Sequence, residues 1–361
     1  MYVLKKAKLY STGKFLERDL LFSTIVEDIG KNLDTKYSKI MVAEGMTVIP
    51  GFVDLHNHFN GAGGEGGPNT RSIPLNSSSL IGSGITTAVG LLGTDGFTRS
   101  LTDLLLQARK LKSDVDTFIY SGSYQVPGPT MTGSLAKDII LIPEVVGVKI
   151  ALSDHRSSYP DRASLIRTVT ETRVSSILAG KPGIIMTHMG TGKLRFEPIF
   201  DVVENTDIPI TQFVPTHIDR NKELLTASVE FAKKGGFLDL TANIRGKTLE
   251  SIRYLISKGV KIENITISTD GNGSFPSFDK DGRLLNIRIA PTDAILKIFV
   301  SLMKQGGDLL NYFMKAVSEN PASRLKLKKG KIEKGYDADF LIFDDSLHLK
   351  YVVSRGKVHT I

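Results

Sequence analysis

The sequence predicts an α/β protein: a (β/α)8 TIM barrel with a small β-sandwich domain formed by both termini. Two observations lead to this fold class. Between residues 52 and 271, eight short apolar segments alternate with helical patterns, which is typical of parallel strands joined by helices. The two ends of the chain are strand-like and lie outside this alternation. A doubly wound open sheet is the alternative architecture.

The eight predicted strands are rich in β-branched and apolar residues and are bounded by glycine, proline or polar residues. They cover residues 52–58, 86–92, 118–124, 147–152, 183–189, 210–217, 237–242 and 265–271. The segments between them carry helical patterns, most clearly at residues 100–111, 162–179 and 221–234. We therefore predict that the barrel occupies residues 50–325.

The terminal segments do not continue the barrel pattern. Residues 1–49 and 326–361 are strand-like and contain turns such as KKGK and EKGY, so we predict that they pair into one small β domain. The N-terminus lacks the uninterrupted apolar core and the cleavage site of a secretory signal. No apolar run approaches the length of a membrane span. We therefore expect a cytoplasmic protein without a membrane partner.

Composition limits the chemistry that is available to the chain. The 361 residues include no cysteine, which excludes disulfides, thiolate metal ligands and a cysteine nucleophile. Any metal must therefore be held by nitrogen and oxygen. The formal net charge is +8, and much of it lies in RLKLKKGKIEK, residues 324–334. No nucleic-acid-binding motif accompanies this run, so we expect a solvated basic face and no nucleic-acid partner.

Four of the seven histidines fall at predicted strand ends, where a TIM barrel gathers its active site. His56 and His58 are two apart on the first strand, so both imidazoles can meet one metal. His188 and His217 lie on the fifth and sixth strands, and Asp270 on the eighth. Any one of these histidines alone would more often be a hydrogen-bonded core residue, and Asp270 could cap a turn. Their joint placement favours a metal site.

Lys149 interrupts the apolar fourth strand, GVKIAL. An ammonium is costly to bury unless it is paired or loses its charge. Burial and nearby cations favour the neutral amine, which can add carbon dioxide and become a carbamate. That anion has two oxygens and can bridge two divalent ions. The alternative is an unmodified lysine at the strand end that pairs with Asp154.

These residues resemble the ligand pattern of the amidohydrolase superfamily and, within it, the isoaspartyl (β-aspartyl) dipeptidases. The stretches that carry the resemblance are AEGMTVIPGFVDLHNH, GGEGGPNTRS, VGLLGTDGFTRS, GSYQVPGPTMTGS, GVKIALSDHRSS, THMGTGK, ITQFVPTHIDRN, KKGGFLDLTA, STDGNGSFP and NPASRLKLKKGKIEKGYDADFLIFD. They extend over most of the barrel and into the return to the superfamily's β-sandwich. Residues 243–262 and 283–297 match less clearly.

The resemblance implies a binuclear zinc metallodipeptidase that cleaves the isopeptide bond of β-aspartyl dipeptides. It implies two zinc ions per subunit with six protein ligands: His56, His58 and Asp270 for one ion, His188 and His217 for the other, and N6-carboxylated Lys149 bridging both beside a hydroxide. Asp270 would pass a proton from the attacking hydroxide to the leaving amine. Tyr124, at the end of the third strand, would hydrogen-bond the developing oxyanion; ordinary barrel packing is its other interpretation.

A β-aspartyl dipeptide carries one free amine and two carboxylates, so its site must hold one cation and two anions. Glu65, in the glycine-rich loop NGAGGEGG, resembles the family's amine-binding glutamate. Arg156 and Arg220 follow two predicted ligands and suit carboxylate binding, although without the resemblance each would be interpreted as a surface residue. Thr94 and Ser274 resemble the remaining polar contacts. The resemblance also implies a homo-oligomer.

Two other functions fit part of the pattern. The first is a metal-dependent amidohydrolase that acts on a cyclic amide or an N-acyl amino acid, which would not need sites for a free amine and two carboxylates. The second is a binding or scaffold protein that keeps the barrel and has lost catalysis. Suitable residues at every predicted ligand position argue against the second.

Overall fold

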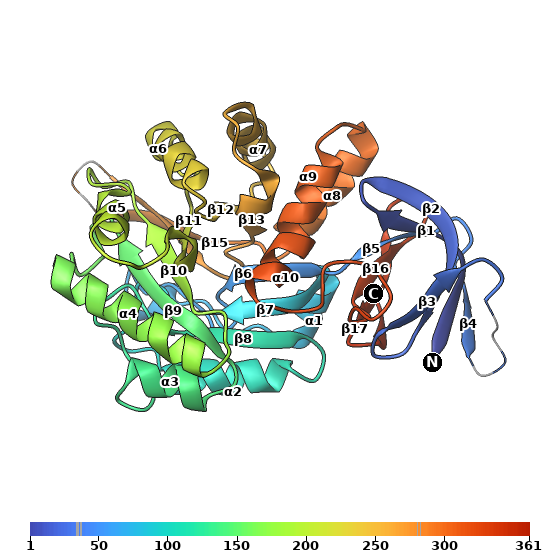
Figure 1. The fold of residues 1–361 in the computed structure, drawn as a ribbon, viewed down its shortest axis with the longest axis horizontal. Coiled ribbons are helices and arrows are strands. Elements are labelled where there is room, and N and C mark those ends of the chain that lie inside the picture. Colours follow the sequence, from blue (N-terminus) through green and yellow to red (C-terminus); the bar gives the residue numbers. More distant parts are fainter. Residues whose placement is uncertain (34–35, 37, 280, 282) are drawn as a thin grey trace.

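The computed structural model describes residues 1–33, 36, 38–279, 281 and 283–361. It confirms the predicted combination of an eight-stranded parallel barrel with a small β domain (Figure 1). Among the helices of these residues, none has the length and apolar character that crossing a membrane requires.

Eight parallel strands follow one another in chain order around the barrel. They are β6 (Phe52–Asn57), β7 (Ile85–Gly90), β8 (Asp116–Gly122), β9 (Val145–Leu152), β10 (Ile184–Met189), β11 (Phe213–Thr216), β12 (Leu238–Thr241) and β13 (Ile265–Ser268). The ring closes where Asn57 forms a parallel bridge with Gly271. At this seam the His58 amide also donates to the Gly271 carbonyl at 2.8 Å. All eight predicted strands are confirmed, and the closure excludes the open sheet.

Helices surround the barrel on its outer side (Figure 1). They are α1 (Ser77–Gly82), α2 (Leu101–Leu111), α3 (Leu135–Leu141), α4 (Arg162–Leu178), α5 (Glu197–Glu204), α6 (Lys222–Lys233), α7 (Lys247–Ser257), α8 (Ala294–Gln305), α9 (Leu310–Met314) and α10 (Asn320–Arg324). Short turns are η1 (Pro68–Thr70), η2 (Ile210–Gln212), η3 (Ile262–Asn264) and the π-helical η4 (Lys315–Glu319). The three clearest predicted helices are α2, α4 and α6.

Local sequence explains where these helices begin. The side chain of Ser100 accepts hydrogen bonds from the amides of Thr102 and Asp103 at the start of α2, and Asn221 accepts from the amide of Leu224 at the start of α6. Such caps satisfy first-turn donors that have no partner inside the helix.

An antiparallel hairpin follows β13 and is absent from the sequence prediction. It consists of β14 (Ser274–Phe278) and β15 (Leu284–Ile289), with Ser274 opposite Ile289. Phe275 of β14 and Arg288 of β15 line the cavity at the carboxyl end of the barrel. The hairpin therefore adds side chains to the mouth of the barrel.

The two termini form the small β domain, as predicted (Figure 1). Its strands are β1 (Tyr2–Ser11), β2 (Lys14–Phe22), β3 (Val26–Gly30), β4 (Lys39–Val42), β5 (Thr47–Pro50), β16 (Phe340–Phe343), β17 (Leu349–Ser354) and β18 (Lys357–Thr360). Strand β5 pairs with β1 on one side and with β16 on the other, which joins the two ends of the chain. Phe22 and Phe340 pack edge to face in its core, 4.8 Å between ring centroids. Its exact boundaries, at residues 49/50 and 325/326, stay predictions.

The predicted solvated basic face is wrong for Lys329, whose side chain is 2% exposed. Its Nζ lies 2.7 Å from Asp116 Oδ2 and 3.1 Å from Asp337 Oδ2, and it also pairs with Asp339. Asp116 begins barrel strand β8, whereas Asp337 and Asp339 precede β16 of the small domain. This buried cation therefore links the two parts. A run of basic residues in the sequence does not show which of them has acidic partners.

Candidate active site

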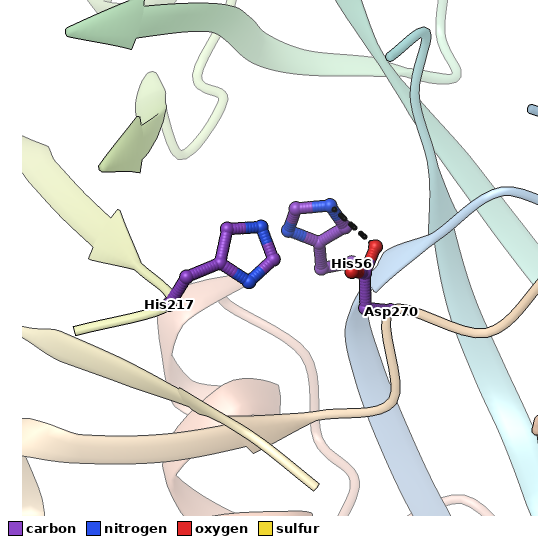
Figure 2. A group of neighbouring side chains, drawn as sticks. All are labelled: His56, His217 and Asp270. Carbon is purple, nitrogen blue, oxygen red and sulfur yellow. Dashed lines mark ion pairs between the residues drawn. The ribbon is translucent and has the colours of Figure 1, made fainter. Parts of the chain in front are cut away.

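Three predicted ligands converge at the carboxyl end of the barrel (Figure 2). His56, His217 and Asp270 are buried and bring their nitrogen and oxygen atoms within 4.8 Å of one another. Asp270 Oδ1 lies 3.3 Å from His56 Nε2 and 3.2 Å from His58 Nε2. Burial lowers the pKa of His56 to about 3, and the charge of Lys149 lowers it too. The imidazole is therefore neutral, the form that binds a metal.

The backbone is in the left-handed region at two of these ligands. His217 has φ 61° and Asp270 has φ 51°, values that are uncommon for residues other than glycine. His217 directly follows the last residue of β11, and Asp270 comes two residues after the last residue of β13. Strained conformations of this kind persist where the surrounding structure enforces them, and they cluster at functional sites.

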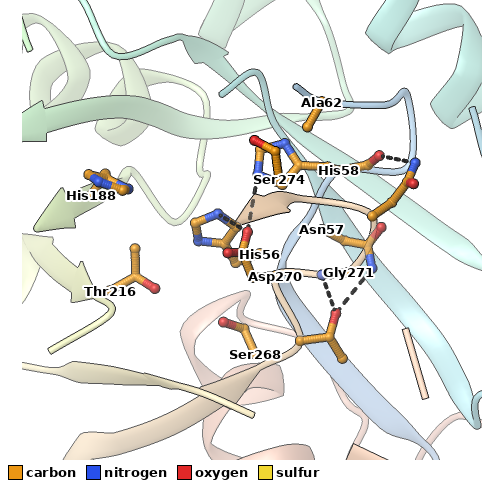
Figure 3. Close-up of polar contacts among 12 residues, drawn as sticks. His56, Asn57, His58, Ala62, His188, Thr216, Ser268, Asp270, Gly271 and Ser274 are labelled. Carbon is orange, nitrogen blue, oxygen red and sulfur yellow. Dashed lines mark hydrogen bonds and ion pairs between the residues drawn. The ribbon is translucent and has the colours of Figure 1, made fainter. Parts of the chain in front are cut away.

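Asp54 supports the seam that carries the first-strand histidines and Asp270. Its Oδ1 accepts from the amides of His56 at 3.2 Å and Thr269 at 3.1 Å. Its Oδ2 accepts from Asn57 Nδ2 at 2.9 Å and from the Thr269 hydroxyl at 2.5 Å. The carboxylate thus joins β6 to the residue just before Asp270. Figure 3 shows Asn57, His58, Asp270 and Gly271 together at this seam.

Lys149 is fully buried, and its Nζ has no hydrogen-bond partner among the described residues. The alternative pairing with Asp154 is not formed. Burial lowers the pKa of Lys149 to about 7, against the opposing effects of Asp270 and Asp239. A substantial fraction of the amine is therefore neutral near pH 7. An unpaired, partly neutral amine beside the predicted metal ligands meets the requirement for carbamate formation.

Both ring nitrogens of His188 have partners in the structure. The Tyr124 hydroxyl lies 2.6 Å from Nδ1, and Asp154 Oδ2 lies 2.9 Å from Nε2. A metal bound by His188 would have to replace one of these two contacts. His188 and His217 are nevertheless neighbours, with ring centroids 4.8 Å apart.

Asp154 has a larger role in the site than the sequence analysis gave it. It is 3% exposed and accepts two hydrogen bonds of 2.9 Å from the guanidinium of Arg156. Although burial raises its pKa, His188 and Arg156 hold the pKa well below the usual range. The carboxylate is therefore ionised and fixes Arg156. The signal that could have revealed it is the stretch ALSDHR, residues 151–156, in which Asp154 stands two residues before Arg156 at the end of an apolar strand.

Thr241 is a second residue that the sequence analysis missed. Its Oγ1 lies 2.7 Å from His217 Nδ1, and Thr241 is the last residue of β12. A contact at Nδ1 fixes the ring and leaves Nε2 available to a metal. The strand-end argument that identified the histidines would also have identified Thr241.

The predicted substrate-binding residues surround one cavity of about 610 Å³ at the barrel mouth. They are Glu65, Thr94, Arg156, Arg220 and Ser274. Glu65 Oε1 accepts from the Ser274 hydroxyl at 3.0 Å and from the Thr94 hydroxyl at 3.2 Å, and lies 3.6 Å from Arg156 Nη1. Arg220 is less engaged, since its Nη1 lies 3.9 Å from Asp154 Oδ2.

The cavity also contacts most of the predicted catalytic and ligand side chains. Its wall includes His58, Tyr124, His188, His217 and Asp270. His56 and Lys149 lie behind this wall, 1% and 0% exposed. The structure therefore brings the predicted site residues together, some in the cavity wall and two buried beneath it.

Comparisons with known proteins agree with this geometry. The amidohydrolase family model matches residues 208–359. The crystal structure of a β-aspartyl dipeptidase from Fervidobacterium islandicum AW-1 in complex with β-Asp-Leu is 41% identical, with a TM-score of 0.94, and the match covers 99% of this chain and 96% of that chain. A second structure of a β-aspartyl dipeptidase from the same organism is 40% identical, with a TM-score of 0.91 and the same coverage. A dihydroorotase from Lactobacillus gasseri is 22% identical over 395 residues, 95% of this chain and 88% of that protein. The chain therefore belongs to the amidohydrolase family, in the group of the β-aspartyl dipeptidases.

Proposed function

We propose that the chain hydrolyses the isopeptide bond of β-aspartyl dipeptides with two zinc ions at the barrel mouth. The observation that carries the proposal is the set Glu65, Arg156 and Arg220 around one cavity with the ligand cluster. One acidic and two basic side chains match the free amine and two carboxylates of such a dipeptide. The 41% identity to a β-aspartyl dipeptidase that was crystallised with β-Asp-Leu supports the same substrate class.

The side chains present fit two divalent ions. They offer imidazole nitrogens and carboxylate oxygens, which suit zinc, and the unpartnered amine of Lys149 would become the bridging carbamate. The proposed ligands are His56, His58 and Asp270 for one ion, His188 and His217 for the other, and carbamylated Lys149 for both. When bound, the ions supply an activated water and polarise the scissile carbonyl.

Asp270 would carry a proton from the attacking water to the leaving amine. Burial raises its pKa, but His56 and His217 outweigh this and keep the pKa well below the usual range. Asp270 is therefore a carboxylate at neutral pH and can take a proton, then deliver it to the leaving amine. Burial raises the pKa of Tyr124, so its hydroxyl stays protonated and can donate to the developing oxyanion.

Glu65 would bind the free α-amine of the isoaspartyl residue. The hydroxyls of Thr94 and Ser274 both donate to it and so fix its orientation. Arg156, which is held by two hydrogen bonds to Asp154, lies on the same side. We expect Glu65→Gln to reduce kcat/KM for β-Asp-Leu much more than for its N-acetylated analogue, which has no ammonium. An equal loss on both substrates would argue against amine binding by Glu65.

The direct test is an assay of the protein, supplied with zinc and bicarbonate, on β-Asp-Leu and α-Asp-Leu side by side. The proposal predicts cleavage of the β isomer alone. If neither is cleaved by protein that contains two metal ions per chain, the proposal fails. Cyclic amides and N-acyl amino acids would then be tested next.

Asp270→Asn tests the proton-transfer role. The amide keeps the size of the side chain but cannot accept the proton, so kcat should fall by about 10²- to 10⁴-fold. The thermal unfolding midpoint, measured on the same preparation, should stay close to that of the unmodified protein. Turnover near the original rate would remove Asp270 from this role.

A further inference from the structure

The cavity at the barrel mouth has two chemically different sides. On one side, Glu65 contacts Thr94 and Arg156, and it also contacts Ser274 at the start of the hairpin. The first three follow β6, β7 and β9. Under the proposed function this side takes the isoaspartyl half of the substrate. The leaving residue, beyond the scissile bond, then faces the other side of the cavity.

The other side is built by the segment after β12 and by the hairpin strand β15, which both contribute residues to the cavity lining. Three basic side chains line it: Arg245, Lys247 and Arg288. We call these three residues the basic rim. All three are exposed, so they can move toward a ligand in the cavity.

The basic rim lacks acidic partners. Within the described residues, neither Arg245 nor Arg288 has a carboxylate oxygen within 4.0 Å of its guanidinium, and Lys247 Nζ donates to the Arg220 carbonyl at 3.1 Å. Asp219 also lines the cavity, but it is only 4% exposed, and burial raises its pKa. Even when ionised, Asp219 offsets one of the three positive charges.

Apolar side chains complete this side of the cavity. Ile244, Phe275 and Ile289 line it and are 55%, 40% and 46% exposed. A side chain with methylene groups and a terminal carboxylate matches this combination, because the methylenes can pack against the apolar surface while the carboxylate meets a guanidinium. A lysine or arginine side chain at the same position would meet like charge.

Resting on the proposed function, we infer that the basic rim selects β-aspartyl dipeptides whose leaving residue has an acidic side chain. Arg220 remains available for the main-chain carboxylate of that residue. The rim would therefore bind the side-chain carboxylate, which is the third negative charge on the substrate. The rim is thus a specificity determinant, separate from the residues that bind the isoaspartyl half.

Substrates that differ only in one charge test this inference. The zinc- and bicarbonate-supplied protein is assayed on β-Asp-Glu, its neutral isostere β-Asp-Gln, and β-Asp-Lys. Exposed ion pairs contribute modestly, and more than one basic side chain can meet the carboxylate, so we expect kcat/KM to be about three- to tenfold higher for β-Asp-Glu than for β-Asp-Gln, and lowest for β-Asp-Lys. Salt at about 0.5 M should reduce the ratio by screening.

Variants assign the effect to the rim. The double substitution Arg245→Gln with Arg288→Gln should bring the β-Asp-Glu to β-Asp-Gln ratio close to one. Arg253→Gln is the matched control, because Arg253 is an exposed arginine of α7 that does not line the cavity. That control should leave the ratio unchanged.

The outcomes separate this inference from the proposed function. Cleavage of β-Asp-Gln and β-Asp-Glu at equal kcat/KM, or a ratio that survives the double substitution, would overturn the inference and leave the dipeptidase function intact. Failure to cleave any β-aspartyl dipeptide would overturn the proposed function itself. A ratio above three that the double substitution alone removes would establish the rim as the selecting element.

Discussion

Two lysines are buried among the described residues, in different regions, and their surroundings are opposite. Lys329, at the junction of the barrel and the small β domain, pairs with three carboxylates, and these raise its pKa although burial acts against them. Lys149, in barrel strand β9, has no hydrogen-bond partner within the described residues, and burial lowers its pKa to about 7. One lysine keeps its charge and the other is partly neutral.

The difference separates a structural cation from a reactive amine. Charges that are buried with full pairing hold elements together, and removing one partner leaves the others uncompensated. A buried amine without a partner costs stability, and such a cost is typical of functional sites. The surroundings of Lys149 therefore agree with its proposed role in metal binding, whereas Lys329 pairs residues of the barrel with residues next to β16.

Replacing Lys149 should have the largest effect on activity. In Lys149→Met the bridging carbamate cannot form, and metal ions contribute several kcal/mol to the transition state, so kcat/KM for β-Asp-Leu should fall about a thousandfold or more. The unfolding free energy of the metal-free protein should hold steady or rise, because a buried amine is replaced by an apolar chain. Activity assays and urea unfolding measure these two quantities, and metal analysis gives the number of ions bound. Two tightly bound metals in this variant would contradict the bridging role.

Lys329→Met should lower stability and leave activity unchanged, the reverse of Lys149→Met. It leaves three carboxylates without their cation, so the unfolding free energy should fall by about 3–5 kcal/mol. The kcat of the folded fraction should remain that of the original protein, because Lys329 lies at the junction with the small domain, away from the predicted ligands. Lys328→Met is the matched control, since Lys328 is exposed. A loss in the control equal to that in Lys329→Met would refute the pairing argument.

Asp54 sharpens the comparison, because it is buried and fully bonded like Lys329 yet lies in the site like Lys149. In Asp54→Asn the amide cannot accept from all four donors, so the seam that holds Asp270 should loosen. We expect kcat and zinc affinity to fall about 10- to 100-fold, as for other partners of metal ligands. Zinc affinity is measured by competition with a chelator.

A second buried aspartate provides the control for Asp54. Asp138 of α3 is fully buried and accepts hydrogen bonds from Ser121, Met131 and Thr132. Asp138→Asn should cost stability, by about 1–3 kcal/mol, without changing zinc affinity. If both variants lose zinc affinity equally, Asp54 acts through general stability and not through the seam.

The sequence was sufficient for the barrel and for most of the ligand cluster. Parallel strands that are buried on both faces leave apolar runs, and the histidines at their ends break those runs visibly, as in THM around His188. Each predicted ligand could therefore be proposed from its position in a strand. Thr241 also lies at a strand end, but threonine is common in strands, so its position alone does not stand out in the sequence.

The rest depends on pairing across the chain. Asp54 lies inside an apolar strand, and its donors include Thr269, more than two hundred residues away. The role of Lys329 depends on Asp116, which is equally remote in sequence, and the rim residue Arg288 lies on a hairpin that the pattern did not predict. Such residues become functional through contacts that no local pattern records.

The measurement that tests the role of Lys149 most directly is a ¹³C NMR titration of the metal-free protein with ¹³C-bicarbonate, at constant dissolved carbon dioxide. Because only the neutral amine adds carbon dioxide and burial lowers the pKa of Lys149 to about 7, a carbamate signal should grow from pH 6 to 8 and then level off. An ordinary lysine, with a pKa of 10.5, would still gain signal above pH 9. The account predicts that Lys149→Met removes the early component and Lys329→Met keeps it. A signal below pH 8 that is equally strong in Lys149→Met, or none below pH 8 in the original protein, would contradict it.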